Sequence, residues 1–473
     1  MLSVADHDII TNTDRGTPMG ELFRRFWLPV MLSEELPGPD CAPIRVRVMN
    51  EDLIGFRDTN GRPGLVDAYC PHRGAPIFFG RNEEAGIRCV YHGWKFDVDG
   101  NCVDLPNAPE GDTFKNKVQI IAYPCVEAGD LVWAYMGPAE KKPPFPEFEW
   151  TKLPKSHRYV TKFIEQCNYL QAMEGDYDPS HARFLHSVLD GAPINTFGNL
   201  NQQQGSQGTR QQLATPATRG WASSDPNEPF PRAVGDRRVR KDDPRASAFG
   251  NTQLVDHEQA MLSANVQQTP EGKFQASVGV TWWMPIFCTA GISAPGHFSS
   301  NMRIPINNES LMFYRLRWSW DPITEDQLAE YKHGGYTHPE LIPGTWVTKA
   351  NLQNDYLVDR VAQKYFSYTG IKTFPLQDIA LIEAQWGPIS KHWLEHLVSS
   401  DYMIIYVRRR LIKAAKELMQ GIEPVGPWHP EVYRFHRDTA TGDTPEEAIQ
   451  RAVERGARPL LPERMPQLAV ATT

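Results

Sequence analysis

The first third of the chain shows the two-residue hydrophobic period that is typical of β-strands. Apolar positions alternate with arginines over 44–48, so this segment is predicted to form a strand. Two dipeptides indicate tight hairpin turns: Asn60-Gly61 and Asp99-Gly100. Further short strands are predicted over 118–122 and 131–135. Short strands at this close spacing predict a small antiparallel β-domain.

The pattern changes after a stretch dense in proline and glycine between residues 137 and 146, which indicates a linker. A mainly helical stretch is expected from 164 to 186, and strands are expected around 274–283 and 310–319. Apolar residues then recur at helical spacing from 404 to 418, which predicts a helix with one buried face. The chain therefore combines helices with antiparallel strands, as an α+β protein does.

Composition and charge narrow the class of protein. The chain has 473 residues with a net charge of −8, whereas a dedicated nucleic-acid binder usually carries a basic surplus. Seven cysteines are too few, and an odd number, for a secreted disulfide framework. We find no signal peptide and no apolar stretch long enough to span a membrane. We therefore expect a cytoplasmic protein that contacts neither nucleic acid nor membrane.

Two pairs of potential metal ligands lie in the β-domain. Cys70 is followed two positions later by His72, and Cys89 is followed three positions later by His92. Four such ligands can hold zinc, although zinc fingers usually pair cysteine with cysteine and histidine with histidine. They can also hold a [2Fe–2S] cluster with two thiolates on one iron and two imidazoles on the other. The remaining alternative is four unrelated residues, two buried thiols and two surface histidines.

A second group of potential ligands follows the linker. Asp178 and His181 are three positions apart and would share one helix face, but His181 and His186 are five apart, about 140° around an ideal helix. Pro179 predicts a kink or a break that could bring both histidines to one metal. A third ligand would have to be a distant carboxylate. The candidates are Asp355, Asp359, Asp378 and Glu383.

The segments CPHRGAP (70–76) and CVYHGWKFDVDGNCVDLP (89–106) resemble the two cluster loops of the Rieske family almost residue by residue. Downstream, the Asp-x2-His-x4-His pattern is similar to that of Rieske non-haem iron oxygenases of the phthalate-dioxygenase type. The resemblance implies a [2Fe–2S] cluster on Cys70, Cys89, His72 and His92 and a mononuclear Fe(II) that uses O2. Its iron ligands would be His181, His186 and Asp378. Asp378 follows Gln377 in a segment that resembles the family's Gln-Asp motif at the start of a helix.

The same resemblance implies the architecture. An N-terminal helical segment, residues 1–40, would pack on the catalytic domain, and it begins with a short helix predicted over 17–27. Residues 41–145 would form the small antiparallel Rieske domain. Residues 146–473 would form the catalytic domain, with a central antiparallel sheet flanked by helices in a helix-grip, START-like arrangement. A homotrimer or a stacked hexamer without a β subunit is expected.

The implied reaction is the hydroxylation of a small organic molecule during aromatic or xenobiotic degradation. Asp178 would bridge to His92 of a neighbouring subunit and carry electrons between the centres. No dinucleotide-binding fingerprint occurs, so a separate NADH-dependent reductase with flavin and ferredoxin centres is expected. An aromatic carboxylate would suit arginines such as Arg210 and Arg245. Apolar pocket candidates are Trp282, Met284, Ile286 and Phe287.

Several alternatives stay open at this point. A tertiary alcohol or an ether-derived molecule is an alternative substrate, because the apolar candidates fit one equally well. A zinc-stabilised binding protein and a Rieske electron carrier are alternatives of another class. The basic residues 408–410 are interpreted as a solvated helix face, with docking to an acidic reductase as the alternative. The five cysteines outside the two loops are expected to be inert thiols.

Overall fold

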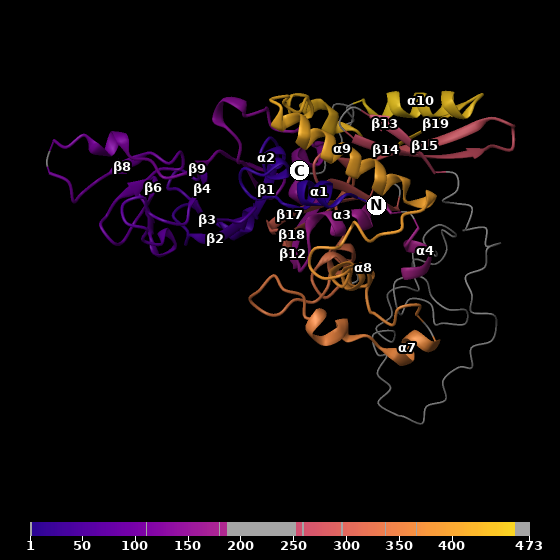
Figure 1. Cartoon of the computed structure of the whole chain (residues 1–473), viewed down its shortest axis with the longest axis horizontal. Helices are drawn as coiled ribbons and strands as arrows, with labels where there is room; N and C mark the ends of the chain where they lie inside the picture. The colour runs from indigo at the N-terminus through magenta and orange to yellow at the C-terminus, as the bar shows by residue number, and fades with distance from the viewer. Residues whose placement is uncertain are drawn as a thin grey trace.

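A β-rich lobe and a larger mixed lobe make up the molecule in the computed structural model (Figure 1). Each lobe has its own hydrophobic core, and the smaller core contains Ile54, Phe56, Ile87 and Phe96. The α+β class predicted from the sequence is confirmed. The structure describes residues 2–109, 111–178, 180–186, 252–257, 260–294, 297–335, 337–365 and 367–458.

Two four-stranded antiparallel sheets form the β-rich lobe. The first has the order β2-β3-β4-β9, with β2 at Ile44–Val48, β3 at Glu51–Arg57, β4 at Pro63–Asp67 and β9 at Ala122–Tyr123. The second has the order β5-β6-β7-β8, with β5 at Arg81–Glu83, β6 at Gly86–Arg88, β7 at Lys95–Phe96 and β8 at Cys102–Asp104. Both predicted hairpin turns are present, and Gly61 and Gly100 have the positive φ that such turns require. The strand predicted over 118–122 is found only at its end, in β9.

A three-stranded sheet connects the two lobes in the order β1-β11-β10, with β1 at Trp27–Leu32, β10 at Cys125–Ala128 and β11 at Leu131–Tyr135. The helix predicted over 17–27 is shorter, because α2 covers Pro18–Phe23 and Trp27 already begins β1. All six β1 residues are buried and all but Val30, at a bulge, are paired with β11, so sheet formation overrides the helical pattern there. Helices α1 (Val4–Thr11) and α2 lie against the long helix α9 (Tyr402–Met419).

An eight-stranded antiparallel sheet forms the centre of the larger lobe. Its order is β12-β18-β17-β16-β15-β14-β13, and β19 pairs with β15. Strands predicted over 274–283 and 310–319 are confirmed as β15 and β18. The strands are β12 (Arg158–Glu165), β13 (Thr252–His257), β14 (Ala260–Gln268), β15 (Phe274–Trp283), β16 (Phe287–Ala294), β17 (His297–Asn307), β18 (Ser310–Ser319) and β19 (Asp438–Gly442).

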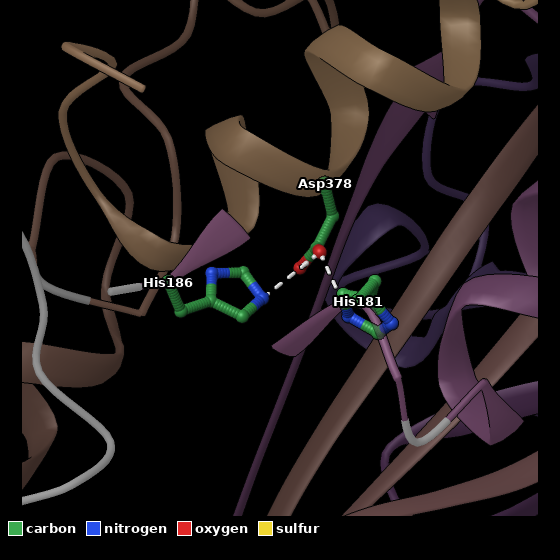
Figure 2. Close-up of side chains that lie close together, drawn as sticks. All are labelled: His181, His186 and Asp378. Atoms are coloured by element: carbon green, nitrogen blue, oxygen red, sulfur yellow. Dashed lines mark ion pairs between the residues drawn. The ribbon is translucent and has the colours of Figure 1, made fainter. Parts of the chain in front are cut away.

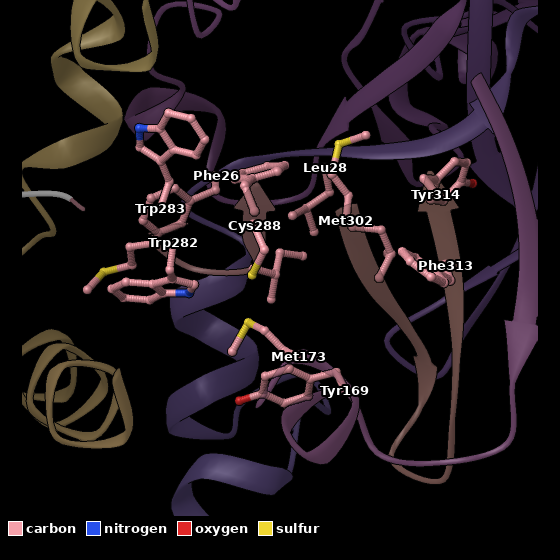
Figure 3. Close-up of a cluster of buried hydrophobic side chains, with 14 of the residues drawn as sticks. Phe26, Leu28, Tyr169, Met173, Trp282, Trp283, Cys288, Met302, Phe313 and Tyr314 are labelled. Atoms are coloured by element: carbon pink, nitrogen blue, oxygen red, sulfur yellow. The ribbon is translucent and has the colours of Figure 1, made fainter. Parts of the chain in front are cut away.

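Helices cover the sheet and carry one of the two candidate metal groups. Helix α3 (Tyr169–Tyr177) packs on β15, β16 and β17, and Figure 3 shows its Tyr169 and Met173 in the buried cluster with Trp282 and Cys288 of the sheet. The other helices are α4 (Ala182–Leu185), α6 (Glu325–Tyr331), α7 (Arg360–Tyr365), α8 (Phe374–Glu383) and α10 (Pro445–Gly456). In the part of the chain that is described, no helix has the length and apolarity needed to cross a bilayer.

Two helical predictions need correction. The stretch 164–186 is mainly helical as expected and has the expected break, because α3 ends at Tyr177 and α4 begins only after His181. Asp178 and His181 therefore do not share a face of one continuous helix. The solvated basic face on α9 is also wrong for Arg408, which is buried and donates to both Glu174 and Glu395. A buried guanidinium requires such carboxylate partners.

Candidate metal centres

Two loops of the β-rich lobe carry the predicted cysteine and histidine pairs. Cys70 and His72 lie between β4 and β5, and Cys89 and His92 lie between β6 and β7. The loops have the same turn, in which the amide of Gly74 donates to the Cys70 carbonyl and that of Gly93 to the Cys89 carbonyl, both at 2.9 Å. Both glycines have positive φ, which a residue with a side chain rarely adopts.

The four side chains form two pairs. The Nδ1 atoms of His72 and His92 are 3.1 Å apart, while Cys70 and Cys89 are both buried. Burial and the neighbouring Cys89 sulfur raise the pKa of the Cys70 thiol to about 11. Among the described residues, no three of these four ligand atoms lie within 4.8 Å of one another. Separate thiol and imidazole pairs suit a two-iron cluster better than a single tetrahedral zinc.

Trp94 holds the imidazole side of this group. Its indole stacks on the His72 ring at a centroid distance of 4.4 Å and an interplanar angle of 12°. The Trp94 Nε1–H donates to Asn107 Oδ1 at 2.8 Å, so the indole itself is fixed. Burial and the facing His72 ring lower the pKa of His92, which keeps that imidazole neutral and able to bind a metal.

The second group is assembled from two distant parts of the chain in the larger lobe. The break between α3 and α4 places His181 and His186 on either side of the Asp378 carboxylate, which α8 contributes (Figure 2). The Nε2 atoms of His181 and His186 lie 3.4 Å and 3.1 Å from Asp378 Oδ1. Ligand atoms of all three lie within 4.8 Å of one another. Two imidazoles and one carboxylate with open positions form the facial arrangement of non-haem Fe(II) sites.

Neighbouring side chains fix the orientation of both histidines. His186 Nδ1 lies 2.7 Å from Gln377 Oε1, and its ring stacks on Phe374 at 3.7 Å. Because the amide oxygen can only accept, His186 carries its proton on Nδ1 and presents the Nε2 lone pair to Asp378. His181 Nδ1 lies 3.5 Å from Asp178 Oδ2. Each histidine thus has a polar partner behind the face it turns toward the group, as metal-binding histidines usually have.

The charges at this second group favour a cation. Burial acts to raise the pKa of Asp378, but the two histidines outweigh it and lower that pKa to about 2. Burial likewise acts to lower the pKa of His181, and the carboxylates of Asp178 and Asp378 outweigh it and raise it to about 10. Buried His186 Nε2 makes no hydrogen bond and is available to a metal. The two carboxylates hold a positive charge on His181, and a divalent metal can take the place of that proton.

The other carboxylates considered as a third ligand lie elsewhere. Asp359 accepts from the amides of Val361 and Ala362 at the start of α7. Buried Glu383 accepts from the Tyr356 hydroxyl and from the Gln166 amide. Asp355 is exposed. Asp378 lies inside α8, which begins at Phe374, so it does not cap that helix.

The residues predicted to line a substrate pocket do not all face one side of the central sheet. Trp282, Met284, Ile286 and Phe287 are all buried in the core of the larger lobe. Cross-strand pairing puts Trp282 beside Cys288 and Trp283 beside Phe287, so Trp282 and Phe287 face opposite sides of the sheet. Arg210 and Arg245 lie outside the described residues. The substrate-pocket assignments therefore stay predictions.

Sequence reasoning did not assign a role to Gln377 or Phe374. Both are contributed by the first two turns of α8, and both hold His186. The only signal in the sequence was the position of Gln377 directly before Asp378. The stacking of Phe374 on His186 had no sequence signal, because the two residues are far apart along the chain.

Comparisons with known proteins identify the family of the chain. The description "Rieske [2Fe-2S] domain" matches residues 26–123, and "LigXa C-terminal domain like" matches residues 134–203 and 283–442. A solved structure of NdmB from Pseudomonas putida CBB5 has the same fold, with a TM-score of 0.52 at 16% identity over 89% of this chain and 97% of that one. The chain is thus a Rieske-domain protein with a LigXa-type catalytic domain.

Two curated relatives narrow this class. The chain is 32% identical to the phthalate 4,5-dioxygenase oxygenase subunit of Pseudomonas putida, over 90% of this chain and 89% of that one. It is 44% identical, over 39% of each chain, to the tert-butanol monooxygenase / tert-amyl alcohol desaturase oxygenase subunit of Aquincola tertiaricarbonis. The chain belongs to the Rieske non-haem iron oxygenases, in the branch of the phthalate dioxygenases. Its cofactors are a Rieske [2Fe–2S] cluster and a mononuclear iron.

Proposed function

We propose that Cys70, Cys89, His72 and His92 hold the Rieske cluster and that His181, His186 and Asp378 hold the mononuclear Fe(II). The observation that carries this assignment is the convergence of two imidazoles and one carboxylate within 4.8 Å. Residues that are 197 positions apart from His181 to Asp378 meet there, which random placement of surface residues would not produce. The paired thiols and paired imidazoles of the other group support the cluster assignment.

When bound, the mononuclear iron of such sites supplies the binding and reductive activation of O2. The chain's own residues prepare that site. Gln377 keeps the His186 proton on Nδ1, so Nε2 is free to bind. The carboxylate of Asp378 contributes one negative charge to a largely buried group, and Phe374 excludes water from one face of the His186 ring. Two histidines and one carboxylate leave coordination positions open for O2 and for a substrate held nearby.

Asp178 is proposed to connect this site to His92 of a second copy. Its side chain lies behind His181 and is about one-fifth exposed. The loop of His92 is surrounded by the exposed side chains of Val90 and Tyr91. Figure 1 shows the cluster-bearing strands and helix α4 in well-separated parts of the molecule, which favours transfer between subunits over transfer within one chain. A homotrimer or a stacked hexamer of this chain alone, without a β subunit, would supply the contact.

The proposed reaction is O2-dependent hydroxylation of a small aromatic carboxylate in the cytoplasm, as part of aromatic or xenobiotic degradation. Electrons would come from NADH through a separate flavin and ferredoxin reductase. The phthalate-dioxygenase relative, matched over most of its length, supports this substrate class. The tert-butanol monooxygenase relative supports the alternative of a tertiary alcohol or ether-derived substrate.

Metal analysis tests the site assignment. The purified protein is expected to contain about three irons and two acid-labile sulfides per chain, with a Rieske EPR signal. His181→Ala should lower the iron content by about one and keep the EPR signal. Loss of the EPR signal together with unchanged mononuclear iron would contradict the assignment.

Product analysis tests the reaction. The holoenzyme would be supplied with a surrogate reductase, NADH and matched pairs of compounds, an aromatic carboxylate against its decarboxylated analogue and a tertiary alcohol against its isomeric primary alcohol. Hydroxylated product from the carboxylate but not from its analogue is expected. Product from the tertiary alcohol alone would establish the alternative, and peroxide without product would eliminate a compound as substrate.

A further inference from the structure

A cavity lies on the face of the central sheet that is turned away from the mononuclear site. It has a volume of about 70 Å³ and is lined mainly by aromatic rings, among them Phe148, Trp283, Phe287, Phe298, Trp318 and Tyr433. One water needs about 10–15 Å³ of such space, so the cavity has room for about five to seven non-hydrogen atoms. A single six-membered ring is of this size.

Strand alternation separates this cavity from the mononuclear site. Asn301 and Arg303 of β17 both donate to Asp176 of α3, so the odd-numbered positions of this strand face α3. Ser300 and Met302 lie between them and line the cavity, so they face the other side. The sheet therefore stands between the cavity and the helices that carry His181, His186 and Asp378.

Several polar groups that line the cavity have no partner. The Trp318 Nε1–H is buried without an acceptor, and neither ring nitrogen of buried His436 makes a hydrogen bond, although Nε2 lies 3.7 Å from Asp438 Oδ2. Buried polar groups are normally satisfied, so unpaired donors around an aromatic cavity indicate a ligand.

Arg437 supplies a positive charge at the exposed edge of the same cavity. It is exposed, and its guanidinium lies directly over Gly279, where an added Cβ would come within 2.9 Å of Nε. Within the described part of the chain it has no ion pair or hydrogen bond. The other charges of the lining have partners, since Arg434 pairs with Glu147 and buried Glu149 acts electrostatically on His436.

We propose that this cavity is a second binding site, distinct from the mononuclear iron site, for a monocyclic aromatic carboxylate. The ring would occupy the space between the aromatic side chains, and Arg437 would bind the carboxylate at the edge. The unpaired Trp318 N–H is a donor, so it requires an acceptor-bearing ligand rather than a cation. The proposal rests on the cavity and its lining and not on the proposed turnover.

Titration calorimetry with benzoate tests the proposal. The holoenzyme is expected to bind benzoate at a site that Arg437→Gln weakens about tenfold, the loss of one charge-assisted hydrogen bond. Ser300→Leu, which fills the cavity, should abolish binding at this site. Arg451→Gln removes an exposed arginine that pairs with Glu447 away from the cavity, and it should change nothing. A crystal of the holoenzyme with 4-iodobenzoate should show iodine among the aromatic side chains.

The outcomes separate this site from the catalytic one. Benzoate binding that persists in His181→Ala and is weakened in Arg437→Gln supports the proposal, whatever the turnover assay shows. Binding that is unchanged in both Arg437→Gln and Ser300→Leu overturns it, as does iodine found only beside His181 and His186. Absence of measurable binding at millimolar benzoate also overturns it. Failure of the proposed hydroxylation would appear only in the product assay.

Discussion

The two candidate metal centres differ in how the chain builds them. The cluster group takes its four side chains from residues 70–92, on two short loops that belong to one small lobe. The mononuclear group takes two histidines from the chain around α4 and its carboxylate from α8, and His186 is buried while the cluster histidines are half-exposed. The ligands of a centre built on local loops can be predicted from their spacing in the sequence. The ligands of a centre built by packing depend on how distant helices are placed in the fold.

Their electrostatics differ as well. In the cluster group, like side chains face one another, and burial raises the pKa of Cys70 while it lowers that of His92. In the mononuclear group, opposite charges meet, so the pKa of Asp378 falls and that of His181 rises. The first arrangement needs metal charge to stabilise two thiolates, and the second already forms an ion pair that a metal can replace.

The largest effect is expected for Asp378→Ala. Removal of the carboxylate leaves two histidines that cannot retain iron. Turnover should therefore fall more than about 100-fold, which exceeds the loss usual for residues that only hydrogen-bond to a metal ligand. The Rieske EPR signal should be unchanged. Asp355→Asn is the matched control, because Asp355 is exposed and asparagine tolerates its positive φ. A similar loss of turnover in that control would contradict the assignment of Asp378, and not Asp355, as the iron ligand.

His72→Cys should affect the other centre alone. A third thiolate replaces an imidazole, so the reduction potential should move toward that of all-cysteine clusters, a fall of about a few hundred millivolts. Redox titration followed by EPR measures it. Mononuclear iron content should stay at the wild-type level, and loss of both metals together would show that the centres are not built independently.

Asp178→Asn tests the proposed electron-transfer role of Asp178 while both metal centres are kept. Asparagine keeps the shape and an oxygen that can accept from Ser180, but it removes the charge behind His181. Both metals should remain, while oxidation of the reduced cluster slows about 100-fold, the upper range for a partner of a metal ligand. Rapid mixing of reduced enzyme with O2 and substrate measures the rate, and wild-type speed would exclude the bridging role.

A smaller effect is expected for Gln377→Leu. The buried Nδ1–H of His186 loses its acceptor, so the ring is no longer held and iron affinity should fall about tenfold. Competition with a chelator measures this affinity. Gln377→Glu should restore much of it, because a carboxylate oxygen accepts the same hydrogen bond.

The smallest effect is expected for Trp94→Phe. A phenyl ring still stacks on His72, but the 2.8 Å hydrogen bond to Asn107 and part of the buried indole surface are lost, so the free energy of unfolding should fall by about 1–3 kcal/mol. The reduction potential should stay within error of the wild type. A large shift in potential would show that the hydrogen bond, and not the stacking, controls the cluster.

Much of the fold was predictable where local patterns decide structure. Alternating hydrophobic residues predicted β2, and the strands predicted as β15 and β18 and the Asn-Gly and Asp-Gly turns were confirmed, because strand period and turn geometry are local properties. The helical pattern failed at Trp27, where pairing with β11 overrides propensity. It also failed at Arg408, since burial beside Glu174 and Glu395 cannot be read from one helix face.

The sequence by itself determined the family and predicted the cluster loops and the two histidines, because each of these is a short pattern of residue types at fixed spacing. The resemblance also indicated Asp378, but only the tertiary structure brought it beside the histidines. Only the tertiary structure decided that Gln377 and Phe374 hold His186 and that Phe287 faces away from the mononuclear group. The physical reason is that these contacts join elements far apart along the chain. Their distances are set by the packing of helices on the sheet and not by local spacing.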